Sequence, residues 1–353
     1  MQRENPASLA ASDNVWIFGF RGSSFVGNRM LPLVEFFGRW EGEVRIEEKN
    51  IAHSRAVTDF FARKSGWEIS LGVREELTLE GNRESVEIIR LLRGKKDLPT
   101  GKTYPVDVNG DGFLAEEIRI GKGWPIGKIP GLSIGVAAGF LHGERIQKAD
   151  VKGILTVTGR RAYDYALDLD YAYDINYLYD LSTGHSSLDG YGYSLNVGAK
   201  YHRAGWDMSL WAEDLFSRIY WSRALYTQAV ANNGRRYFDS EGYVHYDPII
   251  TGFEGKKSVT QNIHEKISLE ASHTWTRVRL SVASDWMRDT YFPRAALAFR
   301  RTATGGWWSM GYNVYFQMAG IQYEGRRGGF ALYSDAIQPG EMGSVGLEGF
   351  IIW

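Results

Sequence analysis

The sequence predicts an all-β protein, a transmembrane antiparallel β-barrel of about 14 strands within a range of roughly 12 to 16. Three observations predict it: polar and apolar residues alternate over long stretches, the chain has 12 Trp and 20 Tyr, and it ends on an aromatic strand. Its 353 residues suit a single barrel domain spanning 1–353, because each strand needs about 10 membrane residues plus loops. No uninterrupted apolar run approaches the ~20 residues of a membrane helix.

The first part of the chain interrupts the strand pattern twice. Residues 46–64 carry apolar side chains at helical spacing before Gly66, which predicts a helix with a glycine stop. Residues 84–93 predict a second helix, with Asn82 as its N-cap. Helices within a strand-rich chain indicate a plug or gate, so 1–14 and 46–64 are candidate luminal plug segments. Surface helices over a loop are an equal alternative.

Further along, long segments alternate strictly between two faces. The apolar stripes begin at Trp67, Tyr163, Tyr191, Val278 and Trp308. Aromatics at the stripe ends suit the membrane interfaces and aliphatics between them suit the hydrocarbon. The opposite faces are small or charged, which suits a wet interior and would be costly in a packed core. A soluble sandwich or propeller would also alternate, but with shorter strands and no need for aromatic ends.

The last strand, residues 343–353, predicts how the barrel closes. Trp353, Ile351 and Leu347 share one face, and the chain ends on the indole. A soluble terminus usually frays in water, whereas the last strand of a barrel pairs with the first and places its aromatics at the interface. We therefore assign barrel closure to Trp353, with an ordinary edge strand as the alternative.

Composition excludes several classes of function. Without Cys there are no disulfides, thiolate metal sites or Cys nucleophiles. The net charge of −1 gives no electrostatic reason to expect a nucleic-acid partner. Residues 1–5 are polar with no apolar core behind them, so no export signal is visible. We expect an outer-membrane protein whose export signal is absent from this sequence.

Residues 107–112 match the first half of a calcium loop. Asp107, Asn109 and Asp111 would supply oxygen ligands two positions apart, before a glycine at the sharp turn. The closing carboxylate belongs at the position that Ile118 occupies. The missing ligand favours a hairpin turn over a Ca²⁺ site, since Asn-Gly and Asp-Gly are preferred turn pairs. We expect no other metal or cofactor.

Acidic residues share one face of the segment that begins at Tyr163. They are Asp164, Asp168, Asp170 and Asp174. Catalytic carboxylates can be arranged so, but an acidic lumen lining that mildly attracts cations needs no chemistry and is the favoured interpretation. The seven His lack metal-site spacing, and no nucleophile elbow or P-loop occurs. We predict no catalytic residue and no enzyme activity.

Two basic pairs stand at predicted strand ends. Arg300-Arg301 and Arg326-Arg327 could meet the phosphates of lipopolysaccharide, although such pairs are more often simply solvated.

Short motifs recur in a characteristic order along the chain. They are Asn5-Pro6-Ala7, Gly123-Trp124-Pro125, Pro130-Gly131-Leu132 and Leu141-His142-Gly143. This order resembles the long-chain fatty-acid transporter superfamily of FadL/PorV-like outer-membrane barrels, and within it the TraF-like branch of unknown function. The resemblance covers nearly the whole chain. It implies a barrel of about 14 strands whose N-terminal segment folds into the lumen, with Asn5, Pro6 and Ala7 in the plug.

The resemblance also implies a function. The expectation is a passive channel or transporter for small hydrophobic molecules in the outer membrane of a Gram-negative bacterium. A plugged barrel that anchors an envelope or secretion assembly is the alternative. The expected partners are outer-membrane lipid and lipopolysaccharide, the barrel-assembly machinery and a small hydrophobic substrate.

Overall fold

The computed structural model describes residues 5–12, 14–36, 38, 40, 43–175, 189–233, 236–238, 244–246, 250–302 and 304–353. The strands of the first half are β1 (Ile17–Asn28), β2 (Lys49–Lys64), β3 (Trp67–Asn82), β4 (Thr103–Pro125), β5 (Leu132–Gly159), β6 (Ala162–Tyr173), β7 (Gly190–Arg203), β8 (Trp206–Glu213) and β9 (Arg218–Asn232). Those of the second half are β12 (Ile250–Asn262), β13 (Lys266–Thr274), β14 (Val278–Met287), β15 (Thr290–Phe299), β16 (Trp307–Asn313), β17 (Met318–Glu324), β18 (Gly328–Ser334) and β19 (Ser344–Ile352). A separate pair comprises β10 (Arg236–Phe238) and β11 (Val244–Tyr246).

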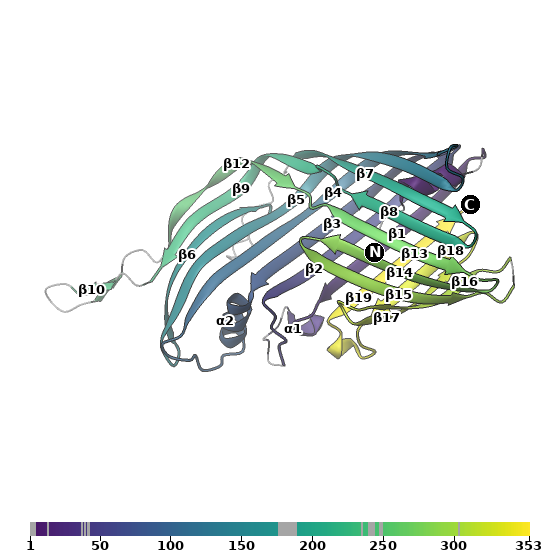
Figure 1. The fold of residues 1–353 in the computed structure, drawn as a ribbon. Helices are drawn as coiled ribbons and strands as arrows, with labels where there is room; N and C mark the ends of the chain where they lie inside the picture. The colour runs from purple at the N-terminus through teal and green to yellow at the C-terminus, as the bar shows by residue number, and fades with distance from the viewer. Residues whose placement is uncertain are drawn as a thin grey trace.

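The barrel closes where the sequence predicts. β1 and β19 pair antiparallel from Gly19 opposite Ile352 to Gly27 opposite Ser344. The Trp353 amide then donates to the Phe18 carbonyl at 3.0 Å. The start of β1 and the end of β19 therefore lie at the same end of the barrel (Figure 1). Closure leaves no unpaired edge at this seam, as a membrane-spanning sheet requires.

The number of strands differs from the predicted figure of about 14. In the part of the chain that the structure describes, 16 strands close the ring and one lies outside it. The physical reason is that three of the strands that cross the wall are interrupted, so each is counted as two. β8 gives way to β9 at 214–217, and β12 gives way to β13 at 263–265. β6 pairs with residues 147–159 of β5, and β7 pairs with residues 132–143 of the same strand. If each interrupted strand is counted once, the 17 strands of the sheet reduce to 14.

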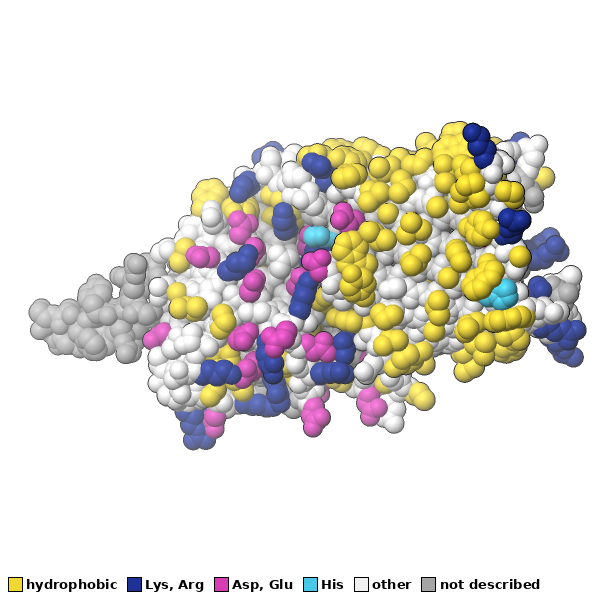
Figure 2. Space-filling view, viewed as in Figure 1, with side chains coloured by type: hydrophobic (Ala, Val, Ile, Leu, Met, Phe, Trp, Pro, Cys, Tyr) yellow, Lys and Arg dark blue, Asp and Glu magenta, His cyan; other side chains and the backbone are white. Residues whose placement is uncertain are grey.

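The outer face of the wall divides into two zones. Over the half nearer the termini, hydrophobic side chains form a belt, whereas charged side chains dominate the other half (Figure 2). Along β3, Ile69, Leu71 and Val73 are exposed while Ser70 is buried, as the alternation predicts. An exposed apolar belt around a closed sheet is the arrangement that a bilayer stabilises.

One side of the barrel is much taller than the other. β4 and β5 are 23 and 28 residues long, whereas β16, β17 and β18 have 7 residues each. On the taller side, β6 pairs with residues 147–159 of β5, β9 pairs with β6, and β12 pairs with β9. We call these three strands, with 103–112 of β4 and 147–159 of β5, the extension.

The prediction of a helix and plug at 46–64 is wrong. Residues 49–64 form the wall strand β2, paired with β1 and β3 along its length. The physical reason is a period of two: Arg55, Val57 and Asp59 are buried towards the lumen while Ala56 and Thr58 alternate with them. Gly66 lies in the tight turn to β3 at φ +82°, a conformation that glycine adopts without strain.

The second predicted helix is confirmed. α2 (Arg83–Arg93) begins at Asn82, whose side chain accepts from the Ser85 amide at 2.8 Å. Ile88 packs with Tyr104 and Leu155 of the extension. The remaining helices are α1 (Leu33–Phe36) and the 3₁₀ turns η1 (Pro6–Ala11) and η2 (Pro339–Glu341). None of the helices in the described ranges has the length and apolarity to cross a bilayer.

Candidate functional site

The N-terminal segment lies inside the barrel. The Asn5 side-chain amide donates to Ser209 Oγ at 2.7 Å and to the carbonyls of Ala199 and Leu210 at 3.2 Å. Its oxygen accepts from the Ala7 amide at 2.9 Å. Glycines on the inner wall make the room: a Cβ at Gly198 would stand 1.9 Å from Asn5 Oδ1. A Cβ at Gly135 would similarly meet the backbone of Pro6 at 2.2 Å.

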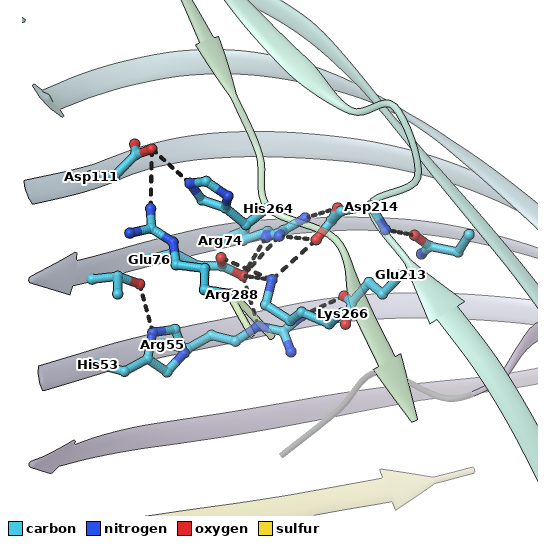
Figure 3. Close-up of polar contacts among 12 residues, drawn as sticks. His53, Arg55, Arg74, Glu76, Asp111, Glu213, Asp214, His264, Lys266 and Arg288 are labelled. Carbon is cyan, nitrogen blue, oxygen red and sulfur yellow. Dashed lines mark hydrogen bonds and ion pairs between the residues drawn. The ribbon is translucent and has the colours of Figure 1, made fainter. Parts of the chain in front are cut away.

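A set of buried charged side chains crosses the lumen (Figure 3). We call it the central ion network; its members are Arg55, Arg74, Glu76, Glu213, Asp214 and Lys266. Arg74 binds Asp214 through two hydrogen bonds of 2.8 and 2.5 Å. Lys266 Nζ lies 3.0 Å from both Glu76 oxygens and 3.2 Å from Asp214 Oδ2.

The network joins opposite walls. Arg55 and Arg74 project from β2 and β3, whereas Lys266 lies on β13 and Glu213 ends β8. Asp214 begins the break between β8 and β9 with φ +64°, and its amide donates to Asn196 Oδ1 at 3.0 Å. The break therefore turns an acidic side chain inward to meet Arg74. Buried charges of this kind are tolerated only when paired.

A smaller group of polar residues continues the network upward. Arg288 lies 3.1 Å from Glu80 and 3.3 Å from Asp111, which also contacts His264 at 3.1 Å. The candidate calcium residues lie next to this group, and Ca²⁺ binding by them stays a prediction. Residues 107–112 are extended within β4, so Asp107, Asn109 and Asp111 share one strand face and form neither a loop nor a turn. Over the described residues, no group of three His, Cys, Asp or Glu is arranged to hold a metal ion.

The side of the lumen bounded by β4, β5, β7 and β9 is filled. Its core comprises Phe113, Ala115, Leu141, Ile146, Ala172, Ile219, Trp221, Ala224, Tyr226 and Ile263. Trp221 is fully buried, and its indole N–H donates to Gln261 at 3.0 Å. Gly143 and Gly190 admit its ring, since a Cβ on either would lie within 2.6 Å of it. We call this side, with the N-terminal segment, the packed half.

The opposite side of the lumen is hollow. A cavity of about 520 Å³ lies along β13 to β19 and is also lined from β1, β2 and β8. Rings and thioethers gather at one place in it: Phe292 and Phe316 stack with centroids 5.5 Å apart, and Phe25 meets Phe316 at 4.9 Å. Elsewhere the lining combines small side chains with charged ones, among them the pair Arg294 and Asp285 at 3.1 Å. We call this side the hollow half.

A second crevice lies among the connections at the other end of the barrel and shares one lining residue with the hollow half. It measures about 170 Å³ and runs between residues 28–32 and 341–343. Phe316 lines both the crevice and the luminal cavity. Its amide donates to Asn313 Oδ1 at 3.0 Å, which fixes the turn that carries it. The Phe316 ring thus stands between the cavity and the crevice.

The four aspartates of the predicted acidic lining lie on β6 and directly after it, and their lining of the lumen stays a prediction. Asp164, Asp168 and Asp170 are exposed on β6 in the extension, while Asp174 is buried and accepts from Gln147. All four are described, and none borders the 520 Å³ cavity. β6 pairs with residues 147–159 of β5 and with β9, beyond the belt.

The sequence reasoning missed the central ion network. The available signal was the run of charges on the inner positions of β2 and β3, at Arg55, Arg74 and Glu76. Their partners are 140 or more residues away for the contacts with Asp214 and Glu213, so no local pattern identifies them.

Comparisons with known proteins were made at three levels. No protein-family model matches the chain, and no curated protein matches it. Among solved structures, the toluene transporter TodX of Pseudomonas putida is similar, with 10% identity, a TM-score of 0.47 and coverage of 99% of this chain and 91% of that one. A TodX deltaS2S3 mutant monoaromatic hydrocarbon channel matches at 9% identity and a TM-score of 0.48, covering 99% and 92%. A Pseudomonas aeruginosa FadL homologue matches at 8% and 0.38, covering 99% and 91%.

The closed antiparallel barrel itself is established by the chain's own strand pairings. At such identities and TM-scores, the similarities carry no argument about function. Placement in the TraF-like branch stays a prediction.

Proposed function

We propose that the protein is a passive channel for small hydrophobic molecules in the outer membrane of a Gram-negative bacterium. The observation that carries the proposal is the position of Phe316 between the outer crevice and the luminal cavity. The belt around the wall supports the location, and the cavity of about 520 Å³ has the size of a small-molecule site. A molecule would enter the crevice, displace the Phe316 ring and reach the hollow half.

The aromatic cluster supports a hydrophobic cargo. Phe25, Phe292 and Phe316 offer ring faces and edges at the constriction, with Met287 and Met318 beside them. An apolar molecule loses little on passing such a lining, whereas an ion would leave its hydration shell without a compensating partner. No bond is made or broken in this process.

The N-terminal segment is proposed as the inner closure. Asn5 and Ser8 line the cavity, and Pro6 and Ala7 are buried against the wall. Asn5 is held by hydrogen bonds to β7 and β8. Movement of this segment would extend the cavity towards the end where both termini lie.

Uptake into proteoliposomes tests the channel. We expect Phe316→Ala to raise the rate of fatty-acid or hydrophobic-dye uptake several-fold, because the ring is the constriction. Phe299→Ala is the matched control, since Phe299 is 53% exposed on the outer face of β15. Uptake that is equal in wild type, Phe316→Ala and empty liposomes would exclude the channel.

A specific observation favours a second function. The central ion network and the packed half close much of the lumen, as expected for a barrel that serves as an anchor or partner-binding component of an envelope assembly. Absent flux, together with a protein partner that co-purifies with wild type in defined amounts, would favour this function over transport.

A further inference from the structure

The end of the barrel that holds both termini is built from short turns. They join β2 to β3, β4 to β5, β7 to β8, β13 to β14, β15 to β16 and β17 to β18. They cover residues 65–66, 126–131, 204–205, 275–277, 300–306 and 325–327. Outer-membrane barrels direct their short turns to the periplasm and their longer connections outward. This end therefore faces the periplasm.

These turns and their edges concentrate positive charge. The basic residues are Lys128, Arg203, Arg277, Arg300, Arg301, Arg326 and Arg327, which we call the turn rim. By sequence, none of the turns contains Asp or Glu, and Glu324, which directly precedes the last turn, pairs with Arg279 at 2.9 Å. In the described part of the chain, Arg301, Arg326 and Arg327 are exposed and form no ion pair. Because the whole chain carries only −1, the excess positive charge is local to this end.

Tryptophans mark the same end. Every exposed Trp of the described residues lies there: Trp16, Trp67, Trp124, Trp206, Trp275, Trp308 and Trp353. The remaining indoles at positions 40, 211, 221, 286 and 307 are buried or half-buried. Cations lie over tryptophan rings at this end: Lys122 Nζ is 4.8 Å from the ring centroid of the exposed Trp67, and the Arg300 guanidinium is 4.6 Å from that of the half-buried Trp307. Indoles settle at the headgroup level of a bilayer, which places the turn rim beside the lipid phosphates.

We propose that the turn rim binds the phosphates of anionic glycerophospholipids in the inner leaflet of the outer membrane. Arginine presents a planar fork of donors that matches phosphate oxygens, and six of the seven rim residues are Arg. Each basic side chain near an anionic surface strengthens the attraction. Figure 2 shows dark-blue side chains at this end, immediately beyond the hydrophobic belt.

The proposal changes the assignment of the two basic pairs. Lipopolysaccharide occupies the outer leaflet, whereas Arg300-Arg301 and Arg326-Arg327 lie at the opposite end of the wall. The exposed tryptophans favour a lipid over an acidic periplasmic protein as the partner, because they place the turn rim at the depth of the lipid headgroups. The proposal does not depend on transport.

Energy transfer from the exposed indoles tests it directly. Wild-type protein in phosphatidylcholine nanodiscs receives a small fraction of either dansyl-phosphatidylglycerol or dansyl-phosphatidylcholine. We expect the anionic probe to be enriched next to the protein on the order of fivefold, the effect of about one basic side chain near an anionic surface. The enrichment should fall as salt is added, because exposed charges are screened.

Matched variants locate the binding. Neutralising the rim with R300Q, R301Q, R326Q and R327Q should bring the two probes to equal transfer. Neutralising four exposed cations elsewhere, with R83Q, K95Q, R160Q and R161Q, should leave the enrichment intact. Heat-modifiable gel migration verifies that both variants are folded barrels. Equal transfer from both probes in wild type, or undiminished enrichment in the rim variant, would overturn the proposal, and an acidic protein would become the better partner.

Discussion

The packed and hollow halves of the lumen share one barrel but use their inward side chains in opposite ways. In the packed half, apolar residues around Trp221 meet the wall closely, and glycines accommodate the N-terminal segment. In the hollow half, charged residues pair with near neighbours along the wall, and a cavity remains. The central ion network lies between them and joins β2 and β3 to β8 and β13.

The difference teaches how a barrel can be both stable and hollow. Long-range pairs across the lumen brace the wall, because each fixes two distant strands at once. Short-range pairs such as Arg294 with Asp285 satisfy charge without filling space. We therefore expect stability to depend on the packed half and permeation on the hollow half.

The largest effect should follow from breaking the network. Arg74→Met leaves Asp214 and Glu76 without their main partner in a fully buried place. Removal of one member of such a buried pair costs about 3–5 kcal/mol. The urea midpoint of unfolding, followed by heat-modifiable migration, measures the loss.

Arg294→Met in the hollow half is the comparison for that variant. Arg294 is one-third exposed and pairs with Asp285, so its loss should cost at most about 1 kcal/mol. Equal losses in the two variants would remove the distinction between the halves.

A smaller effect, on permeation, should follow from displacing the N-terminal segment. Gly198→Ala places a methyl group 1.9 Å from Asn5 Oδ1, so Asn5 must leave its position. We expect higher conductance in planar bilayers, and deletion of residues 1–14 should raise it further.

The same substitution in the hollow half provides the control. A Cβ at Gly311 meets nothing closer than 3.4 Å, so Gly311→Ala should leave conductance unchanged. If neither Gly198→Ala nor the deletion alters conductance, the segment is not the closure.

The smallest effect concerns a surface pair outside the membrane. A hydrogen bond from Arg160 lowers the pKa of Asp97, and the two side chains lie 2.7 Å apart. A folded-state pKa below the unfolded value gives stability above the unfolded pKa, which is lost as pH falls through the folded pKa. Because both groups are exposed and screened, we expect Asp97→Asn to leave the urea midpoint unchanged at neutral and acidic pH. A measurable shift would show that this connection helps to hold the extension.

Sequence alone predicted the wall because alternation is local. The stripe from Trp67 and the closing strand at Trp353 both lie where the pattern indicates. The same reasoning failed at 46–64, because apolar residues at period two also coincide with helical spacing over a few positions. It failed at Asp107, Asn109 and Asp111, where turn-forming residues sit within a strand that neighbours hold extended on both sides.

The site was only partly predictable, for a different reason. Asn5, Pro6 and Ala7 were placed in the lumen by resemblance, and the structure brings Asn5 to the cavity. Phe316 gave no signal, because its role depends on two crevices that meet at a turn. The contact of Arg74 with Asp214 depends on a break in the wall that no alternation pattern reveals.

The wall has unequal height around the barrel. The short strands β16 to β18 end where the wall is lowest, and the crevice at Phe316 lies there. On the other side of the barrel, β4 and β5 extend further along the barrel axis (Figure 1). The rim at this end of the barrel is therefore oblique, low at β16 to β18 and high at β4 and β5. Under the proposed function, a solute would reach the crevice from beside the short strands, where the wall is lowest.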